Sequence, residues 1–188
     1  MGFVRGFKSQ ANKIVDEVRS ELGESSFVAL KPQILSESLG IEIVKLSEFL
    51  EDVPTIKCLL TNQREVFSAV TVFAGSKRTI IHNDSHAFTR QTSNITHELS
   101  HALLHHPPTP ALDDNGCRYW NQDIEDEATW LSGALLVPEV SAIAIARGRW
   151  TIDAAAHHFE VSKDMIRYRL NITGATKRSR RAGAMQAI

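Results

Sequence analysis

The sequence predicts an α+β fold that combines helices with a small, mostly antiparallel sheet. Two observations predict it. Several long segments repeat apolar residues at helical spacing, namely residues 8–22, 89–106 and 121–137. In addition, three β-branched or aromatic runs follow one another within residues 55–82, joined by short polar connections of the kind that link antiparallel neighbours.

Length and composition exclude several classes of protein. A chain of 188 residues with 43% hydrophobic residues can bury an ordinary core, as expected of a globular domain. The 21 Lys and Arg nearly cancel the 22 Asp and Glu, so the global charge favours neither a nucleic-acid binder nor a polyanionic substrate. Cys58 and Cys117 lack the spacing of a thiolate metal site, which indicates a reducing compartment. Because we find no apolar signal region and no window long enough for a membrane span, we expect a cytoplasmic protein.

The chain begins with a predicted amphipathic helix over residues 8–22. Ala11, Val15 and Val18 fall on one apolar stripe with charged residues opposite, and Gly23 ends the pattern. The length of this helix and its single apolar face suit packing onto the rest of a domain.

A short helix and the strands of the sheet are predicted next. After Pro32 the pattern is that of a short helix ended by Gly40, followed by a strand over residues 41–44. Polar turns then separate three further expected strands, at residues 55–60, 65–73 and 78–82. Short connections favour an antiparallel meander for these three.

Two longer helices follow the sheet. The first covers residues 89–106 and is ended by the prolines that begin at Pro107. The segment 107–122 has the composition of a loop. The second long helix covers residues 121–137 and is closed by Pro138.

The C-terminal region predicts a small helical unit. Residues 151–170 fit two short helices joined by a turn, as in a helix-turn-helix. We therefore divide the chain into a core over residues 1–140, a helical subdomain over 141–172 and a basic flexible tail over 173–188.

The helix over residues 89–106 carries the motif H-E-x-x-H as His97, Glu98 and His101. Residues i and i+4 lie on the same helix face, so both imidazoles can reach one zinc ion at about 2.0–2.1 Å. Glu98 lies about 100° around the helix, where it can act as general base toward a water in the site. A helix that is merely rich in histidine is the alternative, because four of the chain's eight histidines fall in residues 94–108. The apolar back of the helix favours the metal site.

A catalytic zinc ion usually has a third protein ligand, which must come from elsewhere in the chain. Glu125 and Glu127 on the next helix are the main candidates, and His86 is a more remote one. Glu125 shares a helix face with small side chains that let another helix approach closely, which favours it over Glu127. Whichever of Glu125 and Glu127 does not bind zinc is expected to lie behind the ligands or at the surface. His105 and His106 are expected to support the site, end the helix or face solvent.

These segments together resemble the ImmA/IrrE family of bacterial and phage metallo-endopeptidases over residues 5–172. The quoted pieces are "GFKSQANKIVDEVRSELG", "LSESLGIEIV", "HNDSHAFTRQTSNITHELSHALLHH" and "IEDEATWLSGALLVP". The most specific marks are the Thr-Arg-Gln that precedes H-E-x-x-H and the helix with E-x-E-A and LL-x-P. Ser100 stands where the family often has Gly, a change between small residues that helix packing tolerates.

The resemblance implies a zincin-like core and a gluzincin-like zinc site. His97, His101 and Glu125 would be the zinc ligands, and Glu98 would be the catalytic base. Some family members cleave a repressor that carries a helix-turn-helix domain and so switch on the genes it silences. The resemblance therefore implies a protein substrate of this kind, in a mobile element or a stress response.

Two further features concern substrate binding. An extended peptide could add to an exposed edge of the sheet at residues 55–82, which is a common mode of peptide recognition. Tyr119 in the loop, or His86 before the motif helix, could donate a hydrogen bond to the developing oxyanion. The alternative for Tyr119 is packing of the loop against the core.

A competing hypothesis starts from the basic C-terminus. Residues 147–188 contain nine Lys or Arg against three acidic residues, and Lys163, Arg167 and Arg169 could contact DNA phosphates. The alternative function is accordingly a zinc-containing regulator that binds DNA or protein without hydrolysis. Glu98 distinguishes the two hypotheses, because a purely structural zinc site has no need of a general base.

Overall fold

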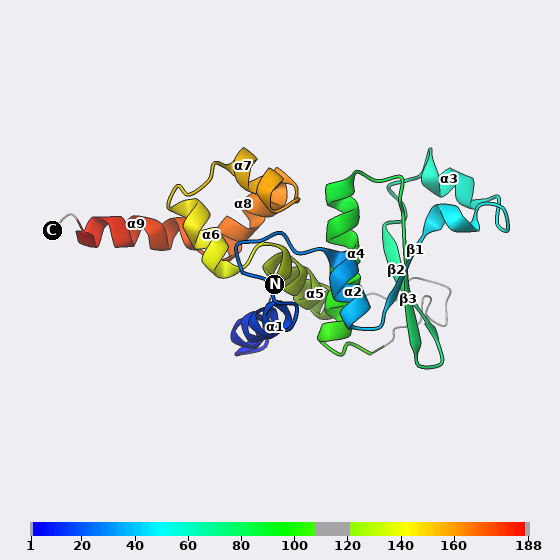
Figure 1. The fold of residues 1–188 in the computed structure, drawn as a ribbon, viewed down its shortest axis with the longest axis horizontal. Helices are drawn as coiled ribbons and strands as arrows, with labels where there is room; N and C mark the ends of the chain where they lie inside the picture. Colours follow the sequence, from blue (N-terminus) through cyan, green and yellow to red (C-terminus); the bar gives the residue numbers. More distant parts are fainter. Residues whose placement is uncertain (1, 108–120, 187–188) are drawn as a thin grey trace.

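The structure, a computed structural model, describes residues 2–107 and 121–186 and has an α+β fold (Figure 1). The sequence-based prediction of the fold class is therefore confirmed. In chain order the elements are α1 (Phe7–Glu21), α2 (Pro32–Ser38), β1 (Glu42–Lys45), the 3-10 helix η1 (Leu46–Phe49), α3 (Ile56–Leu60), β2 (Ala69–Ala74), β3 (Lys77–His82), α4 (Phe88–Leu103), α5 (Gln122–Leu136), α6 (Glu139–Ala146), α7 (Ile152–His158), α8 (Lys163–Ile172) and α9 (Ala175–Gln186).

The sheet is mixed rather than mostly antiparallel. Its strand order is β1-β3-β2, with β1 parallel and β2 antiparallel to the central strand β3. The segment 55–60 does not join it, because it forms the helix α3. A short apolar run fits either helical or strand spacing, and here Pro54 favours a helical turn, with its carbonyl accepting from the Lys57 amide. The neighbours β2 and β3 pair antiparallel, as in the predicted meander, and the distant strand β1 occupies the other side of β3.

The helices α2 and α4 lie on one side of the sheet (Figure 1). Figure 1 shows α2 and α4 on that side, where Ile80 of β3 is fully buried against a core that includes Ile95 of α4. On β2, Val70 and Val72 are 39% and 44% exposed. Because side chains of a strand alternate between faces, the intervening Thr71 points toward α4.

The main hydrophobic core joins α1, α4, α5 and β3. The predicted stripe on α1 is confirmed, because Ala11, Val15 and Val18 are all buried. The next residue on this face is Arg19, whose guanidinium donates to the carbonyl oxygens of Ser25, Val28 and Leu135. The helix α1 therefore packs against α5 and also binds the carbonyl end of that helix.

A second core lies among the C-terminal helices. Two short helices joined by a turn are confirmed as α7 and α8, each opened by a side-chain cap from Thr151 or Ser162. Their buried residues cluster with the end of α5 and with α6, in a group formed by Leu136, Val137, Ile145, Ala155, Ala156, Phe159, Val161 and Ile166. Because α5 contributes to both cores, it connects the two regions that the sequence-based division separates at residue 140. That division remains a prediction.

Within the predicted flexible tail over residues 173–188, the structure has the helix α9 over Ala175–Gln186, which corrects the prediction for those residues. Arg178 pairs with Glu139 of α6, and the Ser179 hydroxyl donates to the Ala146 carbonyl oxygen at 3.2 Å. The polar composition of this segment, taken alone, favours an unstructured tail. Lys, Arg and Ala are nevertheless good helix formers, and α6 supplies a partner.

The helices α5 and α6 meet at a sharp bend. Val137 is extended, and Pro138 precedes the first turn of α6. Within the part of the chain that the structure describes, no single helix is long and apolar enough to cross a membrane. The pair α5 and α6 would pass together by length and composition, but its two helices are bent by 63°.

Candidate metal centre

The helices α4 and α5 pack against each other and bring the predicted ligands together. Small buried residues make this close packing feasible, among them Ser100 on α4 and Ala128 and Ser132 on α5. Asn121 opens α5, where its side chain accepts from the amides of Asp123 and Ile124. Glu125 therefore lies in the first turn of α5.

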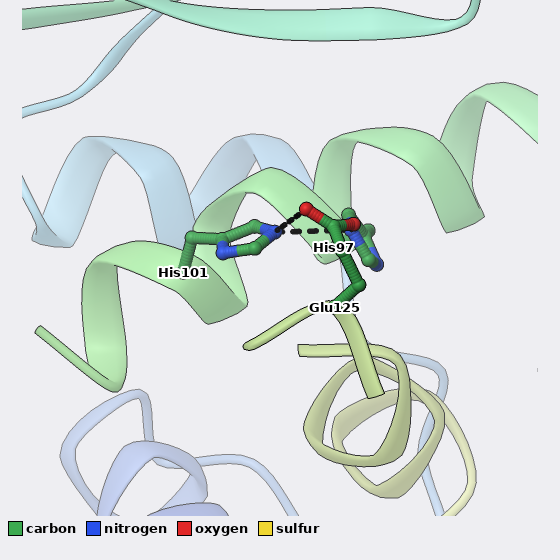
Figure 2. A group of neighbouring side chains, drawn as sticks. All are labelled: His97, His101 and Glu125. Carbon is green, nitrogen blue, oxygen red and sulfur yellow. Dashed lines mark hydrogen bonds and ion pairs between the residues drawn. The ribbon is translucent and has the colours of Figure 1, made fainter. Parts of the chain in front are cut away.

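His97, His101 and Glu125 form one cluster (Figure 2). His97 Nε2 lies 3.1 Å from Glu125 Oε2 and 3.1 Å from His101 Nε2. His101 Nε2 lies 3.7 Å from Glu125 Oε1, and one donor atom from each residue falls within 4.8 Å of the others. The three side chains are 21–25% exposed, so the cluster can be reached from solvent.

The donor set of this cluster fits zinc. Two imidazole nitrogens and one carboxylate oxygen are the three protein ligands of one common type of catalytic zinc site, which keeps a further position open. Burial and the neighbouring His97 together lower the pKa of His101 to about 4, although Glu125 opposes the shift. His101 is therefore neutral near pH 7, with a lone pair available for a metal.

Glu98 lies beside the cluster and is held by the sheet. The Thr71 hydroxyl of β2 donates to Glu98 Oε2 at 2.6 Å. Burial raises the pKa of Glu98, whereas the bond from Thr71 and the nearby His97 lower it. Thr71 is not among the site residues predicted from the sequence. Strand alternation could have found it only if the register between β2 and β3 had been known, since Thr71 pairs with the buried Ile80.

His106 and Glu127 lie behind His101. His106 Nδ1 is 2.9 Å from His101 Nδ1, and His106 Nε2 is 3.2 Å from Glu127 Oε2. His105 is exposed, whereas His106 contacts His101, so the two adjacent histidines have different surroundings. Of the two candidate carboxylates, Glu125 lies in the cluster, whereas Glu127 contacts His106.

His86, one of the two candidate oxyanion donors, is not part of the cluster. His86 is buried, with Nε2 2.8 Å from the Arg64 carbonyl oxygen and Nδ1 3.3 Å from the Asn94 amide. Its ring therefore ties the segment before β2 to α4. Tyr119 lies outside the described residues.

The three candidate DNA-contacting residues differ in their surroundings. Arg169 is fully buried, and its Nε donates to the Val137 carbonyl oxygen at 2.9 Å, so the prediction that it contacts phosphates is corrected. It shares the inward face of α8 with Ile166, a placement that depends on how α8 packs. Lys163 and Arg167 are more than half exposed and pair with Asp153 and Asp164.

The α+β fold and the cluster on α4 and α5 fit a metallopeptidase, which is the class that the family match gives to the chain. Residues 37–171, more than half of the chain, match the family described as the IrrE N-terminal-like domain of peptidase family M78. The chain belongs to this family, as the resemblance predicted. The matched segment contains both α4 and α5 and therefore the whole cluster. No curated protein and no solved structure matches the chain.

Proposed function

We propose that this protein is a zinc-dependent endopeptidase. The observation that carries the proposal is the cluster of His97, His101 and Glu125 beside Glu98, built from two helices that pack together. The three clustered residues would hold the ion. When bound there, zinc supplies a Lewis acid that polarises a carbonyl and makes water a better nucleophile near neutral pH.

The protein's own groups then handle the proton. Glu98 takes it from the attacking water and passes it to the leaving amine, which is the role of a general base and then of a general acid. The Thr71 hydroxyl orients the carboxylate of Glu98 by occupying one of its oxygens at 2.6 Å.

The strand β2 supports a proposal for how the substrate binds. It is one of the two edge strands of the described sheet, and its Thr71 contacts Glu98 directly. An extended peptide that paired with this edge would run past Glu98. Exposed apolar side chains at Val70, Val72 and Phe73 are consistent with a surface that contacts a substrate. The proposed substrate-binding edge is thus residues 69–74, which lie within the segment 55–82 predicted to bind an extended peptide.

The resemblance supports the finer choice of substrate and setting. We propose a repressor with a helix-turn-helix domain, cleaved in the cytoplasm so that the genes it silences are expressed. Tyr119 remains the candidate oxyanion donor, since His86 is bonded to Arg64 and Asn94.

The proposal is tested with purified wild-type protein and the variant Glu98→Gln. About one zinc ion per chain is expected in both, because the change leaves three ligands intact. Each protein is incubated with the repressor-like protein encoded beside it, and cleavage is followed by gel electrophoresis and mass spectrometry. Cleavage by the wild type alone is expected. Wild-type protein that binds no zinc contradicts the proposal.

The second candidate is a zinc-containing regulator that binds DNA or protein without hydrolysis. The paired helices α7 and α8 and the exposed Lys163 and Arg167 favour it. The burial of Arg169 removes one of its three proposed contacts. Zinc binding without cleavage of the repressor, together with retained function of Glu98→Gln in cells, would favour this candidate.

A further inference from the structure

We propose that His106 and Glu127 are positioning residues for the metal centre, joined to His101 in a chain of hydrogen bonds that holds its ring in the orientation needed to bind zinc. The inference rests on the proposed zinc site and adds two residues that do not touch the ion. Both contacts of the chain are present, at 2.9 Å between His101 and His106 and at 3.2 Å between His106 and Glu127.

The end of α4 is built so that His106 returns to His101. His105 has a left-handed backbone with φ of 54°. The His106 amide donates to the His101 carbonyl oxygen at 3.0 Å, and the His105 amide donates to that of Ala102 at 3.1 Å. These two bonds are those of a Schellman motif, which reverses the chain after a helix. Because the motif closes on His101, it places the His106 ring beside that of the proposed ligand.

The chain of bonds has one consistent direction when His101 binds a metal through Nε2. The ring of His101 then carries its hydrogen on Nδ1, which donates to Nδ1 of His106. As an acceptor at Nδ1, His106 carries its own hydrogen on Nε2, where Glu127 Oε2 accepts it. The carboxylate at the far end therefore selects the tautomer of His106, and His106 selects that of His101.

The low exposure of the two side chains and the position of Glu127 favour the hydrogen bonds between His101, His106 and Glu127. The His106 side chain is 9% exposed and that of Glu127 is 23% exposed, so water competes little for the ring of His106. Glu127 comes from α5, the helix that also carries Glu125. The chain therefore connects both helices a second time, on the side of His101 away from the cluster.

The first test measures the affinity of the full-length protein for zinc by competition with a fluorescent chelator. His106→Phe keeps an aromatic ring but removes both nitrogens, and it should weaken zinc binding by about 10- to 100-fold. Glu127→Gln should weaken it less, because the amide oxygen can still accept a hydrogen bond. The matched controls, His105→Asn and Asp123→Asn, change the exposed neighbours and should leave the affinity unchanged.

A double variant separates positioning from general damage. If Glu127 acts only through His106, adding Glu127→Gln to His106→Phe should cause no further loss of affinity. Independent, multiplied losses would overturn the proposed chain. The zinc-free forms are compared by thermal unfolding, and Glu127→Gln, at a partly exposed side chain, keeps the test valid if His106→Phe does not fold.

A spectroscopic measurement reports the direction of the bonds. Long-range proton–nitrogen NMR spectra of the zinc-loaded protein should show hydrogen on Nδ1 of His101 and on Nε2 of His106. Hydrogen on Nδ1 of His106, or unchanged zinc affinity in both variants, overturns the inference while leaving the zinc site in place. Wild-type protein that binds no zinc overturns the proposed zinc site and, with it, the proposed chain of hydrogen bonds.

Discussion

Thr71 illustrates how one hydroxyl group on the sheet can control the chemistry of the motif helix. The carboxylate of Glu98 is largely buried, and burial raises its pKa. Its charged form would therefore be unfavourable without a hydrogen-bond donor. The bond from Thr71 Oγ1 at 2.6 Å fixes one oxygen of that carboxylate. The motif H-E-x-x-H alone contains no information about this partner, because Thr71 is distant in sequence and belongs to another element.

Removing the Thr71 hydroxyl should reduce turnover. Thr71→Val keeps the shape of the side chain but removes a bond to a charged group, which is worth about 1.5–3 kcal/mol. We expect kcat for cleavage of the repressor to fall by about tenfold or more, with unchanged zinc content. Thr71→Ser should restore most of the rate, and Thr79→Val, a change to a hydroxyl on the neighbouring strand, serves as control. An undiminished rate in Thr71→Val would show that Glu98 needs no such partner.

The ends of the helices decide where the functional groups lie. Asn121 begins α5 just before Glu125, and a Schellman motif ends α4 so that His106 faces His101. The predicted start of this helix near residue 121 and the predicted end of the preceding one before Pro107 follow from local residue preferences, so α4 and α5 were both found from the sequence. The helix α3 was missed because an apolar run of six residues fits a strand equally well when no tertiary partner is known.

His105 offers a direct test of the end of α4. Its φ of 54° is in a region that glycine occupies with less strain than histidine. We expect His105→Gly to raise the free energy of unfolding by roughly 0.5–1 kcal/mol, and His105→Val to lower it. Urea unfolding of the zinc-free protein measures both. If His105→Gly were destabilising and His105→Val neutral, the left-handed turn would be wrong.

The two hydrophobic cores are connected through α5, and α1 and α9 meet on α6. Glu139 of α6 accepts from Asn12 of α1 at 2.9 Å and pairs with Arg178 of α9. Neither α1 nor α9 lies within the segment that matches the family, yet both pack against helices of that segment. Elements outside the matched segment therefore contribute to the stability of the matched part.

Glu139 should make the packing of α9 sensitive to acid. Burial raises its pKa, but the bonds from Arg178 and Asn12 lower it more, so the pKa of Glu139 in the folded protein lies below its ordinary value of 4.5. This interaction stabilises the protein above the unfolded-state pKa and is lost as the pH falls through the folded-state pKa. In Glu139→Gln we expect a slightly lower stability near pH 7 and a smaller loss of stability on going to acid. Urea unfolding of both proteins between neutral and acidic pH tests this prediction, and an unchanged pH dependence of stability in Glu139→Gln would contradict it.

Local spacing along the chain was sufficient to predict α1, α2, α4, α5, α7 and α8 and the placement of His97 and His101 on one helix face, because these features depend on residues within about one helical turn. The approach of Glu125 to that face was also anticipated from the small residues beside it. The strand order, the contact of Thr71 with Glu98, the burial of Arg169 and the chain from His101 to Glu127 could not be predicted in this way. Each joins residues that are far apart in sequence, or depends on which face of a helix meets its neighbour. Such contacts form only when the helices have packed and the strands have taken their register.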